Sequence, residues 1–269
     1  MSAVTATPQV TVGELLRSWR RRRSLSQLEL SLDADISSRH LSFLETGRSR
    51  PSREMLLRLA GRLEVPLRER NALLLAAGYA PVYSQTPFDA PDMEIVRQAV
   101  DRFLRAHEPY PAVVIDRHHN LLAGNDALSL MTAGVDPGLL EPPANAIRIA
   151  LHPDGMAPIV LNFAEWSARL VNRLRREARN TGDPELERLL EEVRHYPGVG
   201  WGDAESPGAG EILVPFRMRD PEGGRELAFF STISTFGTAT DITLAEMSIE
   251  AFYPANAATA NRLLRDVGA

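Results

Sequence analysis

The chain has 269 residues, no cysteine and a formal net charge of −5 at pH 7, and 44% of its residues are hydrophobic against 24% charged. These values are typical of globular proteins, and the missing cysteines exclude disulfide bonds and thiolate metal sites. Because the sequence has neither an apolar run long enough to span a membrane nor the layout of a signal peptide, we expect a cytoplasmic protein with no membrane partner.

The charge is unevenly distributed along the chain. Residues 1–80 hold 13 arginines and 8 acidic residues, a balance of +5, whereas residues 81–269 hold 17 arginines and 27 acidic residues, a balance of −10. A basic segment ahead of a larger acidic segment indicates a polyanionic partner, such as nucleic acid, for the first segment.

Five short helices are predicted in the basic segment, from apolar residues at helical spacing and from capping residues. Their ranges are about 12–23, 27–33, 38–45, 53–63 and 66–77. Serines stand at the N-cap position of three of them: Ser26, Ser37 and Ser52. A tight turn between the second and third helices predicts a helix-turn-helix, in which the third helix lies in the DNA major groove.

The third helix is predicted to have one buried and one exposed side. Leu41 and Leu44 would hold it on the domain, so that Ser38, Arg39 and Ser42 face outward near its N-terminus, where side chains can reach base edges. The arginines that follow the helix would lie beside the phosphate backbone: Arg48, Arg50 and Arg53.

The segment LSQLELSLDADISSRHLSFLETGRSRPS, residues 25–52, resembles the xenobiotic-response-element type of helix-turn-helix domain, a group that includes the lambda and Cro-like repressors. The resemblance covers about residues 11–79. It implies that Gln27 binds phosphate at the start of the second helix and that Arg20 and Glu45 form an internal ion pair. The DNA-binding residues that we predict are Gln27, Ser37, Ser38, Arg39, His40, Ser42, Arg48 and Arg50.

The segment departs from the usual pattern of this family at two places. Leu32, Asp33 and Asp35 replace small packing residues at the second helix, which leaves the geometry of the turn open. Phe43 stands where many members carry a polar residue, and it would either pack or touch a thymine methyl. Two alternatives stay open, namely a five-helix protein-interaction module and a packing rather than a base-reading role for His40.

Residues 80–91, APVYSQTPFDAP, predict a linker because proline removes the backbone donors that a helix needs. An amphipathic helix with an N-cap at Asp92 is predicted next, since apolar residues recur at Val96, Val100 and Leu104. It would relay ligand state, form a dimer seam or simply pack. The predicted domains are therefore 1–79, the linker 80–91, and 92–269.

The second domain is predicted to combine an antiparallel sheet with covering helices. Residues 112–126 predict a hairpin, and amphipathic helices are predicted over 162–180 and 183–196. Three later strands are predicted over 211–220, 225–239 and 243–254. The fold class of the whole chain is therefore α + (α+β), with a five-helix lambda-repressor-like domain followed by a sheet domain that resembles a PAS-like sensor.

Four segments of the second domain carry a narrower resemblance: DRHHNLLAGN, LHPDGMAP, NFAEW and TFGTATDITLAEMSIEAFYPANAATA. They resemble the MmyB-like transcription regulators, which join such a helix-turn-helix to a PAS-like ligand-binding domain. The resemblance implies a homodimer that binds a double-stranded, palindromic operator and senses a small apolar effector, such as a fatty-acid-like molecule.

A PAS-like pocket lies between the sheet and its covering helices, so we expect apolar walls with one or two polar anchors. The predicted ligand-binding residues are Arg148, His152, Trp166, Leu170, Phe229, Ile233, Met247 and Ile249. Arg148 and His152 are the anchors for an acidic ligand. The alternatives to ligand binding are structural, namely that the apolar residues fill a core, that Arg148 pairs with an acid, and that His152 ends a helix.

No other chemistry is favoured by the sequence. His118 and His119 adjoin in a turn without a third ligand at metal spacing, which favours surface histidines. No hydrolase, metalloprotease or phosphate-loop motif occurs, so we expect no enzyme activity, metal or cofactor, although a haem ligated by His152 or His195 stays an alternative. The main alternative function is a helix-turn-helix regulator whose second domain mediates protein interaction or dimerisation without a small-molecule ligand.

Overall fold

The structure is a computed structural model that describes residues 10–201 and 214–266. The described chain forms two compact units. The first runs to Gln85 and includes Ala239–Ile242, and the second comprises Thr86–Thr238 and the residues from Thr243 onward. The chain leaves the first unit after Gln85, inside the segment predicted as a linker.

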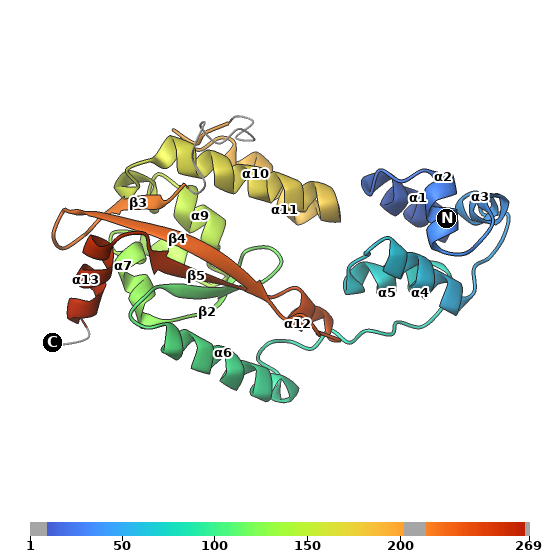
Figure 1. Cartoon of the computed structure of the whole chain (residues 1–269), viewed down its shortest axis with the longest axis horizontal. Coiled ribbons are helices and arrows are strands. Elements are labelled where there is room, and N and C mark those ends of the chain that lie inside the picture. The colour runs from blue at the N-terminus through green and yellow to red at the C-terminus, as the bar shows by residue number, and fades with distance from the viewer. Residues whose placement is uncertain (1–9, 202–213, 267–269) are drawn as a thin grey trace, which may run out of the picture. The chain divides into compact units, whose positions relative to one another are not determined.

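The first unit contains five helices within the described residues, coloured blue to cyan in Figure 1. Their bounds are α1 Val12–Arg22, α2 Gln27–Asp33, α3 Ser38–Glu45, α4 Arg53–Arg62 and α5 Leu67–Ala76. A serine or threonine N-cap precedes each of the first four, and its side chain accepts an N–H group of the first turn. Such caps stabilise a helix start because these N–H groups have no partner within the helix. The five predicted helices are confirmed.

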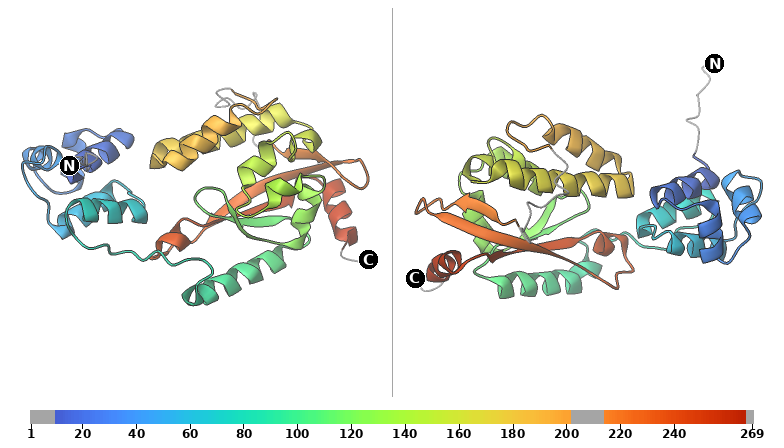
Figure 2. Two further views of the ribbon diagram at one scale, coloured as in Figure 1. Left: turned by 180° about the vertical axis from the view of Figure 1, so that it is seen from behind. Right: turned by 45° about the horizontal axis from the view of Figure 1, so that its top comes forward.

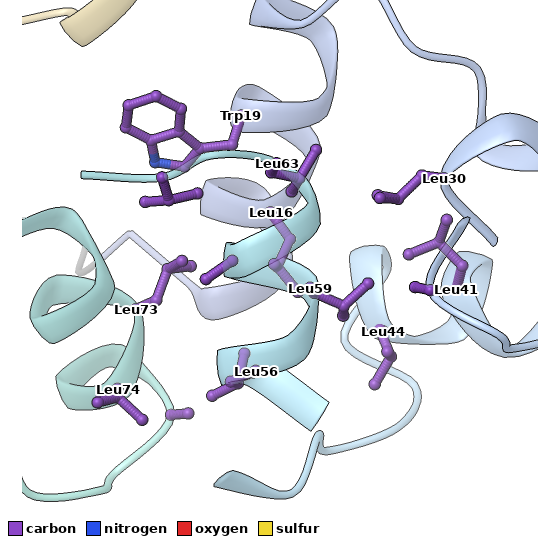
Figure 3. Packing of buried hydrophobic residues seen from close by; sticks show 14 residues of the cluster. Leu16, Trp19, Leu30, Leu41, Leu44, Leu56, Leu59, Leu63, Leu73 and Leu74 are labelled. Carbon is purple, nitrogen blue, oxygen red and sulfur yellow. The ribbon is translucent and has the colours of Figure 1, made fainter. Parts of the chain in front are cut away.

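Leucines from all five helices form the core of the first unit (Figure 3). The side chains that are at most 1% exposed and belong to this core include Leu16, Leu30, Leu41, Leu44, Leu56, Leu59, Leu73 and Leu74. Each contributes about 1.5–3 kcal/mol by leaving water. Leu41 and Leu44 therefore hold α3 against the other helices by its inner side.

The turn between α2 and α3 accommodates the two acids that depart from the family pattern. Asp35 has a φ of 53°, in the left-handed region that Asp tolerates better than most residues. The N–H group of Ile36 then donates to the Ser31 carbonyl at 2.9 Å, and the Ile36 side chain packs against the leucine core. The acids are thus compatible with a helix-turn-helix turn.

The second unit is built on an antiparallel sheet with the strand order β2-β1-β5-β4-β3. The strands are β1 Ala112–Ile115, β2 Leu121–Gly124, β3 Phe216–Arg219, β4 Glu226–Thr235 and β5 Ser248–Pro254. All four neighbouring pairs are antiparallel. The first hairpin strand, β1, therefore lies beside β5, and β2 forms the edge of the sheet, which gives the α+β domain that the sequence predicts.

Helical segments enter before the sheet, between β2 and β3, and around β5. In chain order, the helical segments that precede β3 are η1 Pro91–Met93, α6 Glu94–His107, η2 Asp126–Leu128, α7 Ser129–Thr132, α8 Pro137–Leu140, α9 Ala146–Leu151, η3 Ala157–Ile159, α10 Phe163–Thr181 and α11 Pro184–Val193. The last two are α12 Ile242–Ala245 and α13 Ala257–Asp266. Asp183 caps α11 and Pro184 occupies its first turn, as predicted.

Helices cover both faces of the sheet, with α6 on one face and α10 on the other (Figures 1 and 2). On the α6 face, Val100 and Leu104 pack with Val114, Ile249 and Ala251. On the α10 face, a second cluster joins Trp166 to the aromatic residues of the sheet. The sheet is therefore apolar on both sides.

Several predicted boundaries in the second unit were wrong, among them the end of the strand predicted over 225–239, which ends at Thr235. The last strand begins at Ser248 rather than at residue 243, because Ile242–Ala245 forms the short helix α12. The N-cap of α6 is Met93, because Asp92 lies in the 3-10 turn η1 that precedes it. Residues 211–213 of the predicted third strand lie outside the described residues.

Candidate DNA-binding surface and ligand cavity

The outward side of α3 is polar and its inner side is buried. Ser37 caps the helix, since its hydroxyl accepts the His40 N–H at 3.1 Å. Ser37 and Arg39 are exposed, and Ser38, His40 and Ser42 are half-buried. The N-terminal end of the helix, which carries a partial positive charge, thus presents small polar side chains and one arginine.

Glu45, the last residue of α3, anchors the helix through a buried ion pair. Its side chain is 0% exposed and accepts from Arg20 at 2.6 Å to Nε and 2.8 Å to Nη2. Gln27 also donates to it at 2.8 Å. Burial alone would raise the pKa of Glu45, but the hydrogen bonds from Arg20 and Gln27 outweigh burial and lower the pKa. The ion pair predicted between Arg20 and Glu45 is present.

Two more of the predicted DNA-binding side chains also have partners inside the first unit. One Nε2 hydrogen of Gln27 is donated to Glu45, and the amide lies at the first position of α2. The hydroxyl oxygens of Ser38 and Ser31 are 3.0 Å apart, a hydrogen bond that ties α3 to α2. These contacts fix both side chains at the surface of the helix-turn-helix. A DNA contact by either residue stays a prediction.

Arg39, Phe43 and Arg48 form a stack on the outward side. The guanidinium carbon of Arg39 lies 5.4 Å from the centroid of the Phe43 ring, and that of Arg48 lies 6.0 Å from it. Both distances are within the range of cation–π attraction, which is worth about 0.5–1 kcal/mol at exposed sites. The aromatic ring thus holds two arginines at the surface of α3.

Arg50 has a structural contact that its sequence position does not suggest. Its Nε and Nη2 donate to the Ala77 carbonyl at 3.2 and 2.6 Å, and its guanidinium lies over the Tyr79 ring. A cation at the C-terminus of a helix is stabilised by the partial negative charge there. The structure therefore commits part of the Arg50 guanidinium to the end of α5, and its predicted phosphate contact remains untested.

The second unit contains a partly open apolar cavity of about 90 Å³ between the sheet and its covering helices. Its walls come from β1, β2, β3 and β5 on the sheet side and from the α7, α9 and α10 segments on the other. Apolar members of the wall include Leu121, Met131, Ile149, Met156, Phe216 and Phe252. An apolar cavity with few polar groups is the usual form of a small-molecule site.

Arg173 on α10 and Glu250 on β5 are the two charged residues of the cavity wall. Arg173 Nη2 lies 3.3 Å from Glu250 Oε2, and Glu250 Oε1 accepts the Ser231 hydroxyl at 2.8 Å. Arg173 Nε is buried without a hydrogen-bond partner among the described residues. It lies 3.9 Å from Glu177 Oε1, beyond hydrogen-bond distance. The polar end of the cavity thus holds an arginine with unused donor capacity.

The predicted ligand-binding residues divide into two inside and six outside this wall. Trp166 and Leu170, one turn apart on α10, line the cavity. Phe229 is fully buried in the cluster behind it, with its ring centroid 6.2 Å from that of Phe216. Ile233 is 48% exposed and borders a different hollow. Of the predicted ligand-binding residues, the two on α10 thus lie in the cavity wall and the two on β4 do not.

Met247 and Ile249 were predicted on the wrong side of the sheet. Both pack in the cluster beneath α6, whereas Glu250 and Phe252 of the same strand line the cavity. Neighbouring residues of a strand point to opposite faces, so a strand that is apolar on its α6 face presents its alternate residues to the cavity. Met247 and Ile249 therefore lie on the face of β5 opposite the cavity.

The predicted anchors Arg148 and His152 lie outside the cavity wall. Arg148 donates to Glu192 from Nε at 2.8 Å and from Nη2 at 2.7 Å, and this hydrogen-bonded pairing raises the pKa of Arg148. His152 ends α9 and packs edge-on against Tyr196. Arg148 thus pairs with an acid and His152 ends a helix, as the structural alternatives to ligand binding stated. His195, the other histidine considered for haem, is also absent from this wall.

His119 is buried and His118 is half-buried, which corrects the prediction of two surface histidines. His119 is 5% exposed and its Nε2 lies 2.7 Å from Glu177 Oε2, while His118 Nε2 lies 3.0 Å from Asp183 Oδ2. Burial alone would raise the pKa of Glu177, but the His119 hydrogen bond and nearby positive charges lower it. Among the described residues no group of three or more metal-ligating side chains occurs. The two histidines therefore fasten the hairpin turn to the helices.

Four further wall residues were not predicted from the sequence: Arg173, Glu250, Phe216 and Phe252. A usable signal was the charge of Glu250, because it sits between two buried residues of a strand and must find a partner. The matching arginine on α10 could not be chosen from the arginine-rich helix by spacing alone.

Comparisons with known proteins match both units. Residues 96–265 match the family model described as "MmyB-like transcription regulator ligand binding domain", and residues 16–70 match a helix-turn-helix model. The chain is also similar to the clp gene regulator ClgR from Corynebacterium glutamicum, at 23% identity over 38% of this chain and 99% of that chain. The TM-score of 0.23 is too low for that likeness to carry an argument. No curated protein matches. Within the described residues, every helix is too short or too polar to cross a membrane.

Proposed function

The chain belongs to the family of MmyB-like transcription regulators, and from this premise we propose that it binds a specific operator through α3 and responds to an acidic apolar ligand in its second unit. The observation that carries the DNA part is the two-sided α3: Leu41, Leu44 and Glu45 are buried, and Arg39 is exposed near the positive end of the helix. The balance of +5 over residues 1–80 supports a polyanionic partner.

We propose that the chain acts as a homodimer on a palindromic operator. Two copies of α3 would then enter the major groove at half-sites about 34 Å apart, which is one turn of B-DNA. We keep residues 1–79 as the DNA-binding domain, 80–91 as the linker and 92–269 as the ligand-binding domain. We also propose that the chain is located in the cytoplasm and has no enzyme activity.

The DNA part is tested by selecting duplexes from a random pool with the full chain and measuring their affinity. Replacing Arg39 by Ala should cost about 1–3 kcal/mol on the selected duplex and relax base preference at one position, because a bidentate arginine–guanine contact is lost. Binding to random duplexes should change little. Equal losses on both kinds of DNA would contradict a base-reading role for Arg39.

The ligand part of the proposal rests on two kinds of side chain in the cavity wall, apolar and charged. Apolar side chains form most of it, and Arg173 provides a cation with an unpaired donor at one end. A carboxylate head at Arg173 would gain charge-assisted hydrogen bonds, while an acyl chain would contact the apolar wall. Arg173 replaces Arg148 and His152 as the proposed anchor. The strand order β2-β1-β5-β4-β3, with helices between β2 and β3, supports a PAS-like sensor.

The size of the cavity sets a condition on binding. Its volume of about 90 Å³ is below the ~150 Å³ of an apolar cavity that admits benzene. A whole acyl chain would therefore fit inside only if the wall moves. Met131 and Met156 belong to this wall, and methionine side chains adapt readily because they are unbranched. Ligand binding would thus be coupled to a rearrangement of the α7 to α9 region.

The same small volume favours the alternative in which the second unit mediates dimerisation or protein interaction without a small molecule. Extraction of the purified chain followed by mass spectrometry separates the two. A co-purifying acidic lipid, or a rise in Tm with added dodecanoate, is expected for a sensor, because a ligand that binds the folded state stabilises it. Neither result is expected for the alternative.

A further inference from the structure

Phe43 is an aromatic residue on the side of α3 that carries its polar residues. It is half-buried, and it follows the exposed Arg39 by one helical turn. Its carbonyl accepts the N–H groups of Arg48 and Ser49 at 2.9 and 3.1 Å, which closes the C-terminal end of α3. These two hydrogen bonds hold the Phe43 backbone in place, and the ring lies between Arg39 and Arg48.

We propose that Phe43 contacts a thymine methyl group and that Arg39 binds a guanine on the same or the neighbouring base pair. The proposal rests on the proposed entry of α3 into the major groove and names the bases that α3 reads. In that groove thymine presents its C5 methyl, which an apolar side chain such as Phe contacts, and guanine presents O6 and N7, which arginine binds in a bidentate way.

The spacing of the two side chains carries this assignment. The Arg39 guanidinium carbon lies 5.4 Å from the Phe43 ring centroid, and consecutive bases of one strand are about 3.4 Å apart along the helix axis. Two groups this close reach the same or adjacent base pairs. The cation–π contact also restrains Arg39 before binding, so that less side-chain entropy is lost when it meets guanine.

The geometry favours a DNA contact over a packing role for Phe43. Leu41 and Leu44 are 0% exposed and already hold the inner side of α3. Phe43 stands on the side of α3 that carries Arg39, and two guanidinium groups lie over its ring. Arg48 then stands next to the reading pair, where its charge suits a phosphate rather than a base edge.

The test uses base analogues in the duplex that the full chain selects from a random pool. Replacing one thymine by deoxyuridine removes the methyl and keeps the base pair. Each half-site should contain one thymine at which this single replacement lowers affinity about fourfold, because the contribution of one buried methyl or methylene group is lost. Replacing the guanine at or beside it by 7-deazaguanine should lower affinity about tenfold, since a hydrogen bond to N7 is lost.

Protein variants assign these two effects to residues. The deoxyuridine effect should vanish in Phe43→Ala, and the deazaguanine effect should vanish in Arg39→Ala. Leu32→Ala is the matched control, because Leu32 is an apolar side chain of the same unit, on α2, and is 72% exposed. The deoxyuridine effect should persist in that control.

The outcomes separate this inference from the proposed function. If no duplex is enriched, the proposed DNA binding fails. If a duplex is enriched but no thymine methyl matters, or if its effect persists in a folded Phe43→Ala variant, the inference on Phe43 is overturned while DNA binding stands. Should Phe43→Ala fail to fold, the analogue pair on the unaltered chain still decides, because the sensitive thymine and guanine must lie on the same or adjacent base pairs.

Discussion

Each unit of this protein contains a partly or fully buried arginine–carboxylate pair, and the two pairs differ in how completely they are hydrogen-bonded. Arg20 and Glu45 form a two-point contact at 2.6 and 2.8 Å, and Gln27 supplies a further donor. Arg173 and Glu250 meet at one point, 3.3 Å apart, and Arg173 Nε has no hydrogen-bond partner among the described residues. The first pair is saturated, and the second is not.

The difference separates a structural pair from one that is suited to recognition. A buried charge is tolerated only when its partners replace the water that it has lost, and the Arg20–Glu45 pair meets that requirement within the fold. The Arg173 side chain borders a cavity, and its buried Nε lacks a hydrogen-bond partner among the described residues. The first pair is thus complete within the fold, whereas the second leaves one donor unused.

The largest effect is expected from breaking the saturated pair. Replacing Glu45 by Ala leaves Arg20 buried without its carboxylate, and removing one partner of a buried pair costs about 3–5 kcal/mol. Hydrogen exchange of peptides from α1 and α3, measured in the full chain, should accelerate accordingly. The same measurement on the second unit of Glu250→Ala should show a smaller change. Comparable losses in the two variants would remove the distinction between the pairs.

The next effect concerns the unsaturated pair and a ligand. Replacing Arg173 by Ala should weaken dodecanoate binding by about 1.5–3 kcal/mol, the range of a hydrogen bond to a charged group. Binding of dodecanol, which lacks the carboxylate, should change far less in isothermal titration calorimetry. Arg148→Ala is the matched control, because Arg148 pairs with Glu192 outside the cavity. An equal loss for alcohol and acid would mean that Arg173 only shapes the wall.

Much of the first unit could be predicted from the sequence because its signals are local. Serine caps and leucine spacing lie within a few residues of the feature they determine, so the five helices and the outward side of α3 followed from the pattern. The contact of Arg50 with the Ala77 carbonyl joins positions 27 residues apart. No local pattern indicates such a contact.

The cavity was harder to predict because the sheet is apolar on both faces. Alternation along β5 identifies two sets of residues, but the choice of the set that faces the cavity depends on where α6 and α10 pack. Met247 and Ile249 were assigned to the wrong face for this reason. The contact of His119 with Glu177 spans 58 positions and was likewise invisible to motif spacing.

A smaller effect is expected from acid. The folded-state pKa of Glu45 lies below its unfolded value, so its contribution to stability is complete above the unfolded pKa of about 4.3 and is lost as the pH falls through the folded pKa. Hydrogen exchange of α1 and α3 should therefore lose protection in that acidic range. Glu45→Gln should show a flatter pH dependence there. An unchanged profile would contradict the role of this carboxylate.

The smallest effect compares two arginines that follow α3. Arg48→Ala should reduce the slope of log affinity against log salt by about 0.9, the value for one phosphate contact on B-DNA. Arg50→Ala should reduce the slope less, since its guanidinium already donates to the Ala77 carbonyl. Fluorescence anisotropy over a salt series measures both slopes. Equal reductions would show that the α5 contact does not withhold Arg50 from DNA.

The central proposal is that a ligand in the second unit changes operator binding by the first, and one measurement tests it directly. The affinity of the full chain for its selected duplex is measured with and without saturating dodecanoate, in the unaltered chain and in Arg173→Ala. We predict that the ligand changes operator affinity by roughly 5- to 150-fold, the usual range of coupling between two sites, and that Arg173→Ala requires more ligand for the same change. An operator affinity that is identical with and without bound dodecanoate would contradict the proposal.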